Sequence, residues 1–435
     1  MDYAARRAAF MQRIGEGVAV IPGACERLRN GDSEYPFRQD SDFLYLTGFN
    51  EPDAVLVLAP AAARDRTVIF LRDRDPAKEV WNGARLGVER APFTLGLDAA
   101  YSIERLEDVL PDCLVGSGRL YYALGKDFAF DRRVLAAVEA AQDRGGRLRA
   151  FPQELVDPGT VLHEMRLHKD ADEVAVMRRA AQITALGHSE AMRVTVPGMH
   201  EFELQAHIEF AYRRAGAQDV AYTSIVAGGD NATTLHYNTN RMRLDDGCLV
   251  LVDSGCELDG YASDVTRTWP VNRRFTPEQR AVYEVVLLAQ RAGIETVKPG
   301  RGCRDFHEAC VRVITEGLID LGLLSGSVDE NIETNAYRAY YMHGSGHWLG
   351  LDVHDAGRYR DDAGQYRALE PGMVTTVEPG IYIGRDATVP QDFRSIGIRI
   401  EDDILVTAHG NENLTADIPK TVDEIEAIVG AGACV

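Results

Sequence analysis

The sequence lacks cysteines in any paired arrangement, and this absence excludes several classes of protein. Its seven cysteines are an odd number, and no two of them are separated by just two residues. Zinc ribbons, thioredoxin-type redox centres and fully disulfide-bonded scaffolds therefore find no support. We expect reduced thiols, as in a cytoplasm.

Long apolar runs are also lacking. No stretch approaches the roughly 18–20 apolar residues that cross a membrane as a helix, and residues 1–17 carry charges throughout, unlike a signal peptide. We therefore expect a soluble, cytoplasmic protein with no membrane partner.

Positive charge is scarce relative to negative charge. The chain has 47 lysines and arginines against 67 aspartates and glutamates, and so a net charge of −20. A surface of this average charge repels phosphate backbones, so no nucleic-acid partner is expected. The surplus supplies many carboxylates, although most such charges simply face solvent.

The chain is long enough for more than one domain. At about 150 residues per domain, its 435 residues predict two or three domains. Pro152, Pro158 and Gly159 interrupt any helix near the middle of the chain, and Asp170 with Glu173 forms a capping-box pattern that starts a new helix. We therefore predict an N-terminal domain over residues 1–165 and a second domain over residues 166–435.

The two predicted domains differ in their patterns. Residues 1–165 alternate apolar runs with helical periodicity, which predicts an α/β domain. Its expected strands are 17–21, 43–49, 54–58, 67–71 and 119–124, and its expected helices are 2–14 and 131–143. Residues 166–435 combine helices with antiparallel hairpins, which predicts an α+β domain. Its expected helices are 170–194, 200–215, 277–297 and 303–321, and its expected strands are 248–255, 261–271, 373–380 and 397–407.

Two aspartates mark the most informative hairpin. Asp259-Gly260 is a strong two-residue turn signal. A turn there pairs positions whose numbers sum to 519, so Asp253 lies opposite Thr266, and Asp264 projects from the same side of the sheet as Asp253. Both aspartates could simply face solvent. If they do not, they repel each other unless one holds a proton or a cation lies between them.

Histidines and glutamates follow later in the chain. His343, His347 and His354 lie in a glycine-rich stretch that does not fit the H-E-x-x-H zinc helix. Each alone could be an ordinary core or surface residue, but three within twelve positions favour a functional role.

Charged residues also interrupt the last apolar strands. Glu378 ends an apolar strand, where a carboxylate is costly unless it is paired or binds a metal. Arg399 and Glu401 share one face of the last predicted strand, either as an ion pair on an edge strand or as part of a site. Two aspartates, two glutamates and one histidine suit manganese, cobalt, iron or zinc, and their four negative charges can neutralise two divalent ions.

These segments carry a family resemblance. In chain order they are D-S-G at 253–255, S-D-V-T-R-T at 263–268, H-G-S-G-H-W-L-G-L-D-V-H-D at 343–355, V-E-P-G at 377–380 and G-I-R-I-E-D-D at 397–403. Together they resemble the pita-bread metallopeptidases, and most closely their bacterial aminopeptidase P branch. Residues 32–58 also resemble the N-terminal region of that branch. The resemblance implies a creatinase-type N-terminal domain with a mixed sheet, followed by a pita-bread catalytic domain of pseudo-twofold architecture.

The resemblance further implies a dinuclear metal site. Its ligands would be Asp253, Asp264, His347, Glu378 and Glu401. Asp264 and Glu401 would bridge two divalent ions, Asp253 would be a terminal ligand of one ion, and His347 and Glu378 would be terminal ligands of the other. Manganese is the usual ion in this branch, with cobalt, zinc or iron as alternatives.

Other residues acquire roles by the same resemblance. Glu378 would exchange protons with a metal-bridging hydroxide, His236 would contact the substrate, His354 would stabilise the oxyanion, His343 would line the proline side of the pocket, and Arg399 would orient ligand carboxylates. Tyr222, Trp348 and Tyr382 are aromatic candidates for the substrate pocket, although core packing is an equally good reading of Trp348 and Tyr382. Trp81 resembles a residue contributed across a subunit interface, which implies a homo-oligomer, either a dimer or a tetramer.

The implied activity is the release of the N-terminal residue from peptides with proline in second position. Prolidase, which has the same site but cleaves only Xaa-Pro dipeptides, is the main alternative. Methionine aminopeptidase fits less well because a long N-terminal domain precedes the site. A binding protein of the same fold would typically have lost metal ligands, whereas this chain has all five. Ser345 departs from the family, which usually has an aliphatic residue there, and so local packing and substrate preference at this position stay open.

Overall fold

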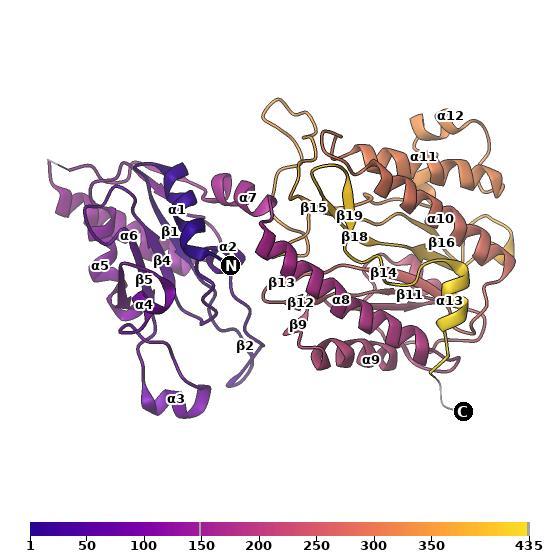
Figure 1. Ribbon diagram of the computed structural model, residues 1–435, viewed down its shortest axis with the longest axis horizontal. Coiled ribbons are helices and arrows are strands. Elements are labelled where there is room, and N and C mark those ends of the chain that lie inside the picture. Colours follow the sequence, from indigo (N-terminus) through magenta and orange to yellow (C-terminus); the bar gives the residue numbers. More distant parts are fainter. Residues whose placement is uncertain (148, 433–435) are drawn as a thin grey trace. The chain divides into compact units, whose positions relative to one another are not determined.

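The computed structural model describes residues 1–147 and 149–432 and divides the chain into two units, Met1–Met165 and Arg166–Val435 (Figure 1). Each unit has its own buried apolar core. No helix among the described residues is both long enough and apolar enough to span a membrane. Cys434 lies outside the described residues, and the other six cysteines are free thiols.

A six-stranded mixed sheet organises the first unit. Its strand order is β6-β5-β4-β1-β7-β8. β4 pairs antiparallel with β1 and β5, whereas β5–β6, β1–β7 and β7–β8 are parallel. The strands are β1 (Val18–Pro22), β4 (Val55–Leu58), β5 (Thr67–Leu71), β6 (Ala99–Ser102), β7 (Arg119–Tyr121) and β8 (Glu154–Val156), with a separate small hairpin of β2 (Leu28–Asn30) and β3 (Ser33–Glu34). The α/β prediction for this unit is confirmed.

Helices accompany this sheet along the chain. They are α1 (Tyr3–Ile14), α2 (Ser41–Thr47), α3 (Pro76–Asn82), α4 (Ala91–Leu95), α5 (Leu106–Leu114), α6 (Phe128–Gly145) and α7 (Gly159–Leu167). The strand predicted over residues 43–49 is wrong, because this segment forms α2. The Asp40 carboxylate caps the backbone N–H groups of Asp42 and Phe43, and Gly48 ends the helix in the left-handed conformation. A short apolar run cannot by itself distinguish a buried helix from a strand.

The second unit places antiparallel strands between two pairs of helices. α8 (Ala171–Val194) packs with α9 (Glu201–Arg214), and α10 (Pro277–Thr296) packs with α11 (Asp305–Asp320). α8 and α9 contact the strands nearest the Asp253 hairpin, and α10 contacts the strands near Glu378 (Figure 1). The shorter helices are α12 (Val328–Glu333) and α13 (Val422–Ile428). This α+β arrangement agrees with the prediction.

The strands of this unit form small sheets. These are β10-β11-β14, β13-β12-β9, β15-β18-β19 and the pair β16-β17. Their bounds are β9 (Asp219–Val220), β10 (Ile225–Gly228), β11 (Leu249–Asp253), β12 (Cys256–Leu258), β13 (Tyr261–Ala262), β14 (Thr266–Pro270), β15 (Val374–Val377), β16 (Gly380–Ile383), β17 (Ile396–Arg399), β18 (Asp402–Val406) and β19 (Asn411–Asn413).

The Asp259-Gly260 hairpin has the predicted register but not the predicted continuity. Asp253 pairs with Thr266 in β11–β14, and Leu258 pairs with Tyr261 at the turn. The long strands expected over 248–255 and 261–271 each break in two, so that β11 and β14 belong to one sheet and β12 and β13 to another. Asp253 and Asp264 flank this break, where the backbone leaves the regular ladder.

The two late strands are interrupted in the same way. The predicted strand 373–380 ends at Val377, one residue before Glu378, and the predicted strand 397–407 is divided at residues 400–401. Arg399 therefore ends β17, and Glu401 lies between β17 and β18 rather than in one continuous strand with Arg399. The predicted alternation nevertheless holds across the break, because both side chains face the same cavity.

Candidate active site

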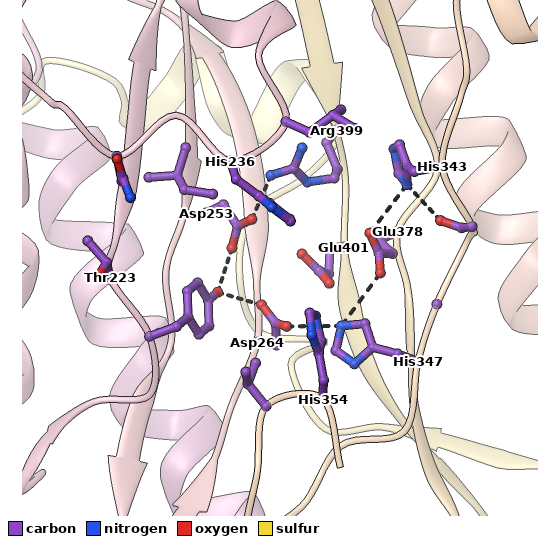
Figure 2. Close-up of a pocket in the computed structure, with 17 residues that line it drawn as sticks. Thr223, His236, Asp253, Asp264, His343, His347, His354, Glu378, Arg399 and Glu401 are labelled. Atoms are coloured by element: carbon purple, nitrogen blue, oxygen red, sulfur yellow. Dashed lines mark hydrogen bonds and ion pairs between the residues drawn. The ribbon is translucent and has the colours of Figure 1, made fainter. Parts of the chain in front are cut away.

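A cavity of about 470 Å³ gathers most of the candidate residues. It is lined by Asp253, Asp264, His347, Glu378 and Glu401. His236, His343, His354, Arg399 and Tyr222 line it as well. Figure 2 shows the labelled carboxylates of Asp253, Asp264, Glu378 and Glu401 gathered in this cavity with the His347 ring. Residues far apart in the sequence thus meet in one hollow.

The two aspartates lie side by side beneath one hydroxyl. Tyr222 Oη lies within hydrogen-bond distance of a carboxylate oxygen of Asp253 and one of Asp264. A phenol has a single proton and can donate to only one acceptor at a time. The repulsion between these two buried carboxylates is therefore only partly compensated by the protein. Burial, together with both aspartate charges, raises the pKa of Tyr222 well above its ordinary value, so its hydroxyl stays protonated.

His347 completes this cluster with one ring nitrogen turned toward the carboxylates. Its Nε2 lies 3.3 Å from Asp264 Oδ2 and 3.6 Å from Glu378 Oε1. Its Nδ1 lies 3.0 Å from the backbone carbonyl of Trp348, which fixes the N–H on that side. This is the usual arrangement for a histidine whose other nitrogen binds a metal. Burial opposes protonation, but the Asp264 contact and the Glu378 charge outweigh it and raise the pKa of His347 to about 9.

The two glutamates are crowded by negative charge. Burial, and then the charges of Asp264, Glu378 and Asp253, raise the pKa of Glu401 well above its ordinary value. Burial raises the pKa of Glu378 to about 7, although His347 and Arg399 oppose this shift. Carboxylates with raised pKa values in one cavity indicate that a bound cation would stabilise their ionised form.

The Arg399 guanidinium donates hydrogen bonds to three side chains around the cavity. Arg399 places Nη2 2.6 Å from Asp253 Oδ2, Nη1 3.0 Å from Tyr382 Oη and Nε 3.0 Å from Thr266 Oγ1. Thr266 in turn donates its hydroxyl to Glu401 Oε2 at 2.5 Å. Arg399 and His347 are the cations among these contacts, and they face four carboxylates.

The donor chemistry fits divalent metal ions. Asp264, His347 and Glu401 each offer a ligand atom, and these atoms all lie within 4.8 Å of one another. Carboxylate oxygens combined with one imidazole are the ligands of manganese, cobalt, iron and zinc. A divalent ion would relieve the repulsion that Tyr222 and Arg399 leave uncompensated. The residues present therefore fit the metal centre.

The remaining histidines occupy different parts of the cavity. His343 Nε2 lies 2.8 Å from Tyr382 Oη, and its Nδ1 lies 3.6 Å from Glu378 Oε2. Burial, helped by the Arg399 charge, lowers the pKa of His343 to about 3, so its ring is neutral. His354 packs its ring edge-on against His347, with centroids 4.3 Å apart. His236 lines the cavity from an exposed loop.

The predicted pocket aromatics are only partly in place. Trp348 is 1% exposed, stacks on Tyr359 and does not line the cavity, because it follows His347 in an extended segment and faces the core. Tyr382 does not line the cavity either, and it acts through its hydrogen bonds to His343 and Arg399. Tyr222 lines the cavity, but it contacts the aspartates. Trp81 lies on α3 in the first unit and is 85% exposed.

Sequence reasoning missed two features of the site. The first is Thr266, which links Arg399 to Glu401. The predicted hairpin register placed Thr266 opposite Asp253, and this position could have identified Thr266 as a residue of the site. The buried Ser345 places its hydroxyl 2.8 Å from His307 Nδ1 and also bonds the Tyr341 hydroxyl, while its backbone carbonyl accepts from the Glu378 N–H. No local pattern indicated that contact between α11 and the histidine segment.

Comparisons with known proteins agree with this geometry. The model of metallopeptidase family M24 matches residues 175–408, and the model of the aminopeptidase P N-terminal domain matches residues 3–121. The chain is 47% identical to the Xaa-Pro aminopeptidase of Haemophilus influenzae, covering 98% of this chain and 96% of that protein.

Solved structures give the same result. The structure of Pseudomonas aeruginosa aminopeptidase PepP matches with a TM-score of 0.97 at 50% identity, over 99% of this chain and 98% of that one. A zinc-substituted Escherichia coli aminopeptidase P in complex with product matches with a TM-score of 0.96 at 45% identity, over 100% of this chain and 99% of that one. The chain belongs to metallopeptidase family M24, with an aminopeptidase P N-terminal domain and a pita-bread catalytic domain.

Proposed function

We propose that this M24 metallopeptidase is an Xaa-Pro aminopeptidase, which releases the N-terminal residue from peptides with proline in second position. The observation that carries the proposal is the convergence of four carboxylates and one imidazole in a single cavity. The names of the relatives, Xaa-Pro aminopeptidase and aminopeptidase P, support the choice of substrate.

Five residues would hold two divalent ions in this proposal. Asp264 and Glu401 would bridge the ions, Asp253 would bind one of them, and His347 and Glu378 would bind the other. The close approach of the Asp264, His347 and Glu401 ligand atoms supports this assignment. When bound, the ions supply positive charge that acidifies a water molecule and polarises the scissile carbonyl. We propose manganese as the working ion, with cobalt, zinc or iron as alternatives.

The chain's own side chains would perform the remaining steps. Glu378 would take the proton of the attacking water and deliver it to the departing proline nitrogen, which has no N–H of its own in the peptide. His354 would donate a hydrogen bond to the carbonyl oxygen as negative charge develops on it, and His236 would contact the substrate near the scissile bond. His343, which Tyr382 holds, would line the proline side of the pocket. Arg399 would keep Asp253 in place.

A second cavity favours longer peptides over dipeptides. It has a volume of about 580 Å³ and shares Gly344 and Gly346 with the first cavity. Nothing lies within 4 Å of the position that a side chain would occupy at Gly344. This space supports an aminopeptidase rather than a prolidase, because a dipeptide would leave it empty.

We also propose that the protein forms a dimer or tetramer in the cytoplasm. Support comes from α3, which has no buried residues and exposes Val80 and Trp81 by 81% and 85%. Trp81 would then reach the site of a neighbouring subunit. Light scattering after size-exclusion chromatography tests the assembly, and Trp81→Ala should reduce activity only if the protein is oligomeric.

Hydrolysis of a small peptide panel tests the proposed activity. We expect cleavage of both Xaa-Pro-Yaa-Yaa and Xaa-Pro-Yaa peptides after chelation and manganese addition, and no cleavage of peptides without proline at position two. Cleavage of Xaa-Pro dipeptides alone would establish a prolidase instead. Recovery of less than one equivalent of metal, with no rescue by manganese, would indicate a binding protein.

A variant of Glu378 tests its proposed role. Glu378→Gln removes the proton acceptor but keeps the size of the side chain, so the folded protein should lose nearly all turnover. Near-wild-type turnover in a folded Glu378→Gln variant would overturn the assignment.

A further inference from the structure

A buried ion cluster lies next to His354 and contains none of the proposed metal ligands or substrate contacts. Asp355 follows His354, and its side chain is 1% exposed. Lys169 Nζ lies 2.9 Å from Asp355 Oδ2, and Arg166 Nη2 lies 2.6 Å from Asp355 Oδ1. The side chains of Lys169 and Arg166 are themselves 1% and 4% exposed. Burying charged groups to this degree costs desolvation free energy, so a buried ion cluster indicates a structural or functional role.

Asp355 closes the turn that carries His354. Its side chain accepts the backbone N–H of Asp352, and its own N–H donates to the carbonyl of Trp348 at 2.9 Å. The Gly350 carbonyl accepts the N–H of Ala262 at 2.8 Å, two residues before Asp264. The turn over residues 350–355 is therefore tied both to the histidine segment and to the hairpin that supplies the aspartates.

Gly350 shows how closely this cluster approaches the backbone. A Cβ atom at Gly350 would lie 2.2 Å from Asp355 Oδ2 and 2.9 Å from Lys169 Cε. No residue with a side chain fits there unless the carboxylate and the lysine move apart. The ion cluster and the path of the turn thus depend on each other.

His354 has little else to hold it. Its residue is exposed to solvent, and its ring makes an edge-on contact with the ring of His347. A ring that is not held by burial takes its position from its backbone. The backbone at residue 354 is fixed by the turn that Asp355 closes.

We infer that Lys169 and Arg166 are positioning residues for His354, acting through Asp355 and the turn over residues 350–355. This inference rests on the proposed function insofar as His354 is assigned to the scissile carbonyl. Arg166 and Lys169 come from the end of α7 and the residues just after it, so a segment without any ligand residue would set the geometry of the oxyanion donor.

A double-mutant cycle tests the inference. Lys169→Met keeps the aliphatic stem and removes the charge, and we expect it to lower kcat about 10- to 100-fold, a part of the roughly 100- to 1000-fold that loss of an oxyanion donor costs. KM and the bound metal should change little. In a His354→Ala background the same change should cost less than about twofold, because residues that act through one group are not additive. Full additivity, or a loss of metal in proportion to activity, would overturn the inference.

Matched variants separate positioning from general stability. Asp352→Asn alters the half-exposed carboxylate that also contacts Arg166, and it should reduce kcat less than about threefold because Asp355 keeps both cations. Asp355→Asn is nearly isosteric and should reproduce the loss seen for Lys169→Met if that variant folds poorly. Equal losses for the Asp352 and Asp355 variants would contradict the inference.

A spectroscopic measurement keeps the inference independent of the proposed activity. The ring Cε1–H signal of His354, assigned by its absence in His354→Ala, can be followed by NMR in the full-length, metal-free protein. We expect one sharp signal in the wild type, and a shifted or broadened signal in Lys169→Met. An unchanged signal would overturn the inference. Wild-type protein that fails to cleave proline peptides would overturn the proposed function while leaving this measurement valid.

Discussion

Replacing Thr266 by valine should weaken metal binding without disrupting the fold. Valine keeps the shape of threonine but loses the hydroxyl that donates to Glu401 and accepts from Arg399 Nε. Thr266 is fully buried, so no water replaces these contacts. A hydrogen bond to a charged group contributes roughly 1.5–3 kcal/mol. Arg399 keeps Asp253 and Tyr382 as partners, so we expect the lower end of this range, about 2 kcal/mol of unfolding free energy.

The Thr266→Val substitution should also lower the affinity for metal ions. Glu401 would lose the contact that orients it, and losing such an outer contact typically costs about 10- to 100-fold in metal affinity. Competition against a fluorescent chelator measures the manganese dissociation constant, and denaturant titration of the metal-free protein measures stability.

Thr268 provides the matched control. It is also fully buried, two residues further along β14, but its hydroxyl contacts only the backbone of Arg399. Thr268→Val should therefore cost stability, about 1 kcal/mol, and leave metal affinity within about threefold of wild type. Thr266→Ser should retain most of the wild-type affinity. Wild-type metal affinity in Thr266→Val, or an equal loss in Thr268→Val, would refute the reasoning.

Three further predictions follow from buried groups. Burial, together with the Arg267 charge, lowers the pKa of His188 to about 4, so the folded state excludes a proton that the unfolded chain binds below pH 6.5. The free energy of unfolding should therefore be highest above pH 6.5 and fall by up to about 3 kcal/mol toward pH 4. Denaturant midpoints measured between these pH values should fall less steeply for His188→Gln than for the wild type. A Cβ at Gly346 would lie 2.1 Å from the Thr376 carbonyl oxygen, so Gly346→Ala should destabilise the protein by about 1–3 kcal/mol. A Cβ at Gly344 would meet nothing within 4 Å, so Gly344→Ala should leave the melting temperature unchanged. Similar melting temperatures for the two variants would contradict this prediction. Removing divalent ions should lower the melting temperature by mass action while circular dichroism shows the same secondary structure, and loss of that structure on chelation at 25 °C would show that the cavity is not preformed.

The hairpin register was predictable because a short turn determines it. Asp259 and Gly260 both have positive φ, at 49° and 84°, as a type I′ turn requires. Once the turn is placed, the residue numbers of paired positions have a constant sum, which puts Asp253 opposite Thr266. The breaks in these strands were not predictable, because they follow from the transfer of each strand between two small sheets.

The position of the histidines depended on tertiary structure. Three histidines share one glycine-rich segment, and the sequence pattern alone does not say which of them faces the aspartates. His347 does so because its backbone N–H donates to Thr376 Oγ1 and its neighbour Trp348 forms a bridge with Thr375. The family resemblance, and not the spacing, singled out His347.

The exclusion of Trp348 from the cavity, by contrast, could have been deduced. Adjacent residues in extended backbone point to opposite sides. Once His347 faces the carboxylates, Trp348 must face the core, where it is stacked on Tyr359. Core packing, the second reading given for Trp348, is therefore the one that fits the geometry of the segment.

Backbone contacts between distant strands explain how mutually repelling carboxylates are held together. The Glu401 N–H donates to the Thr266 carbonyl, and the Arg267 guanidinium donates to the backbone carbonyls of both Thr266 and Glu401. These bonds join β14, which follows Asp264, directly to the segment that carries Glu401, and none of them uses a ligand side chain. Because the backbone sets the positions of the ligands, their repulsion is stored in the folded chain and is relieved when cations bind. A site built in this way gains metal affinity from the stability of its scaffold, so substitutions of Arg267 should weaken metal binding even though its side chain contacts no ligand carboxylate.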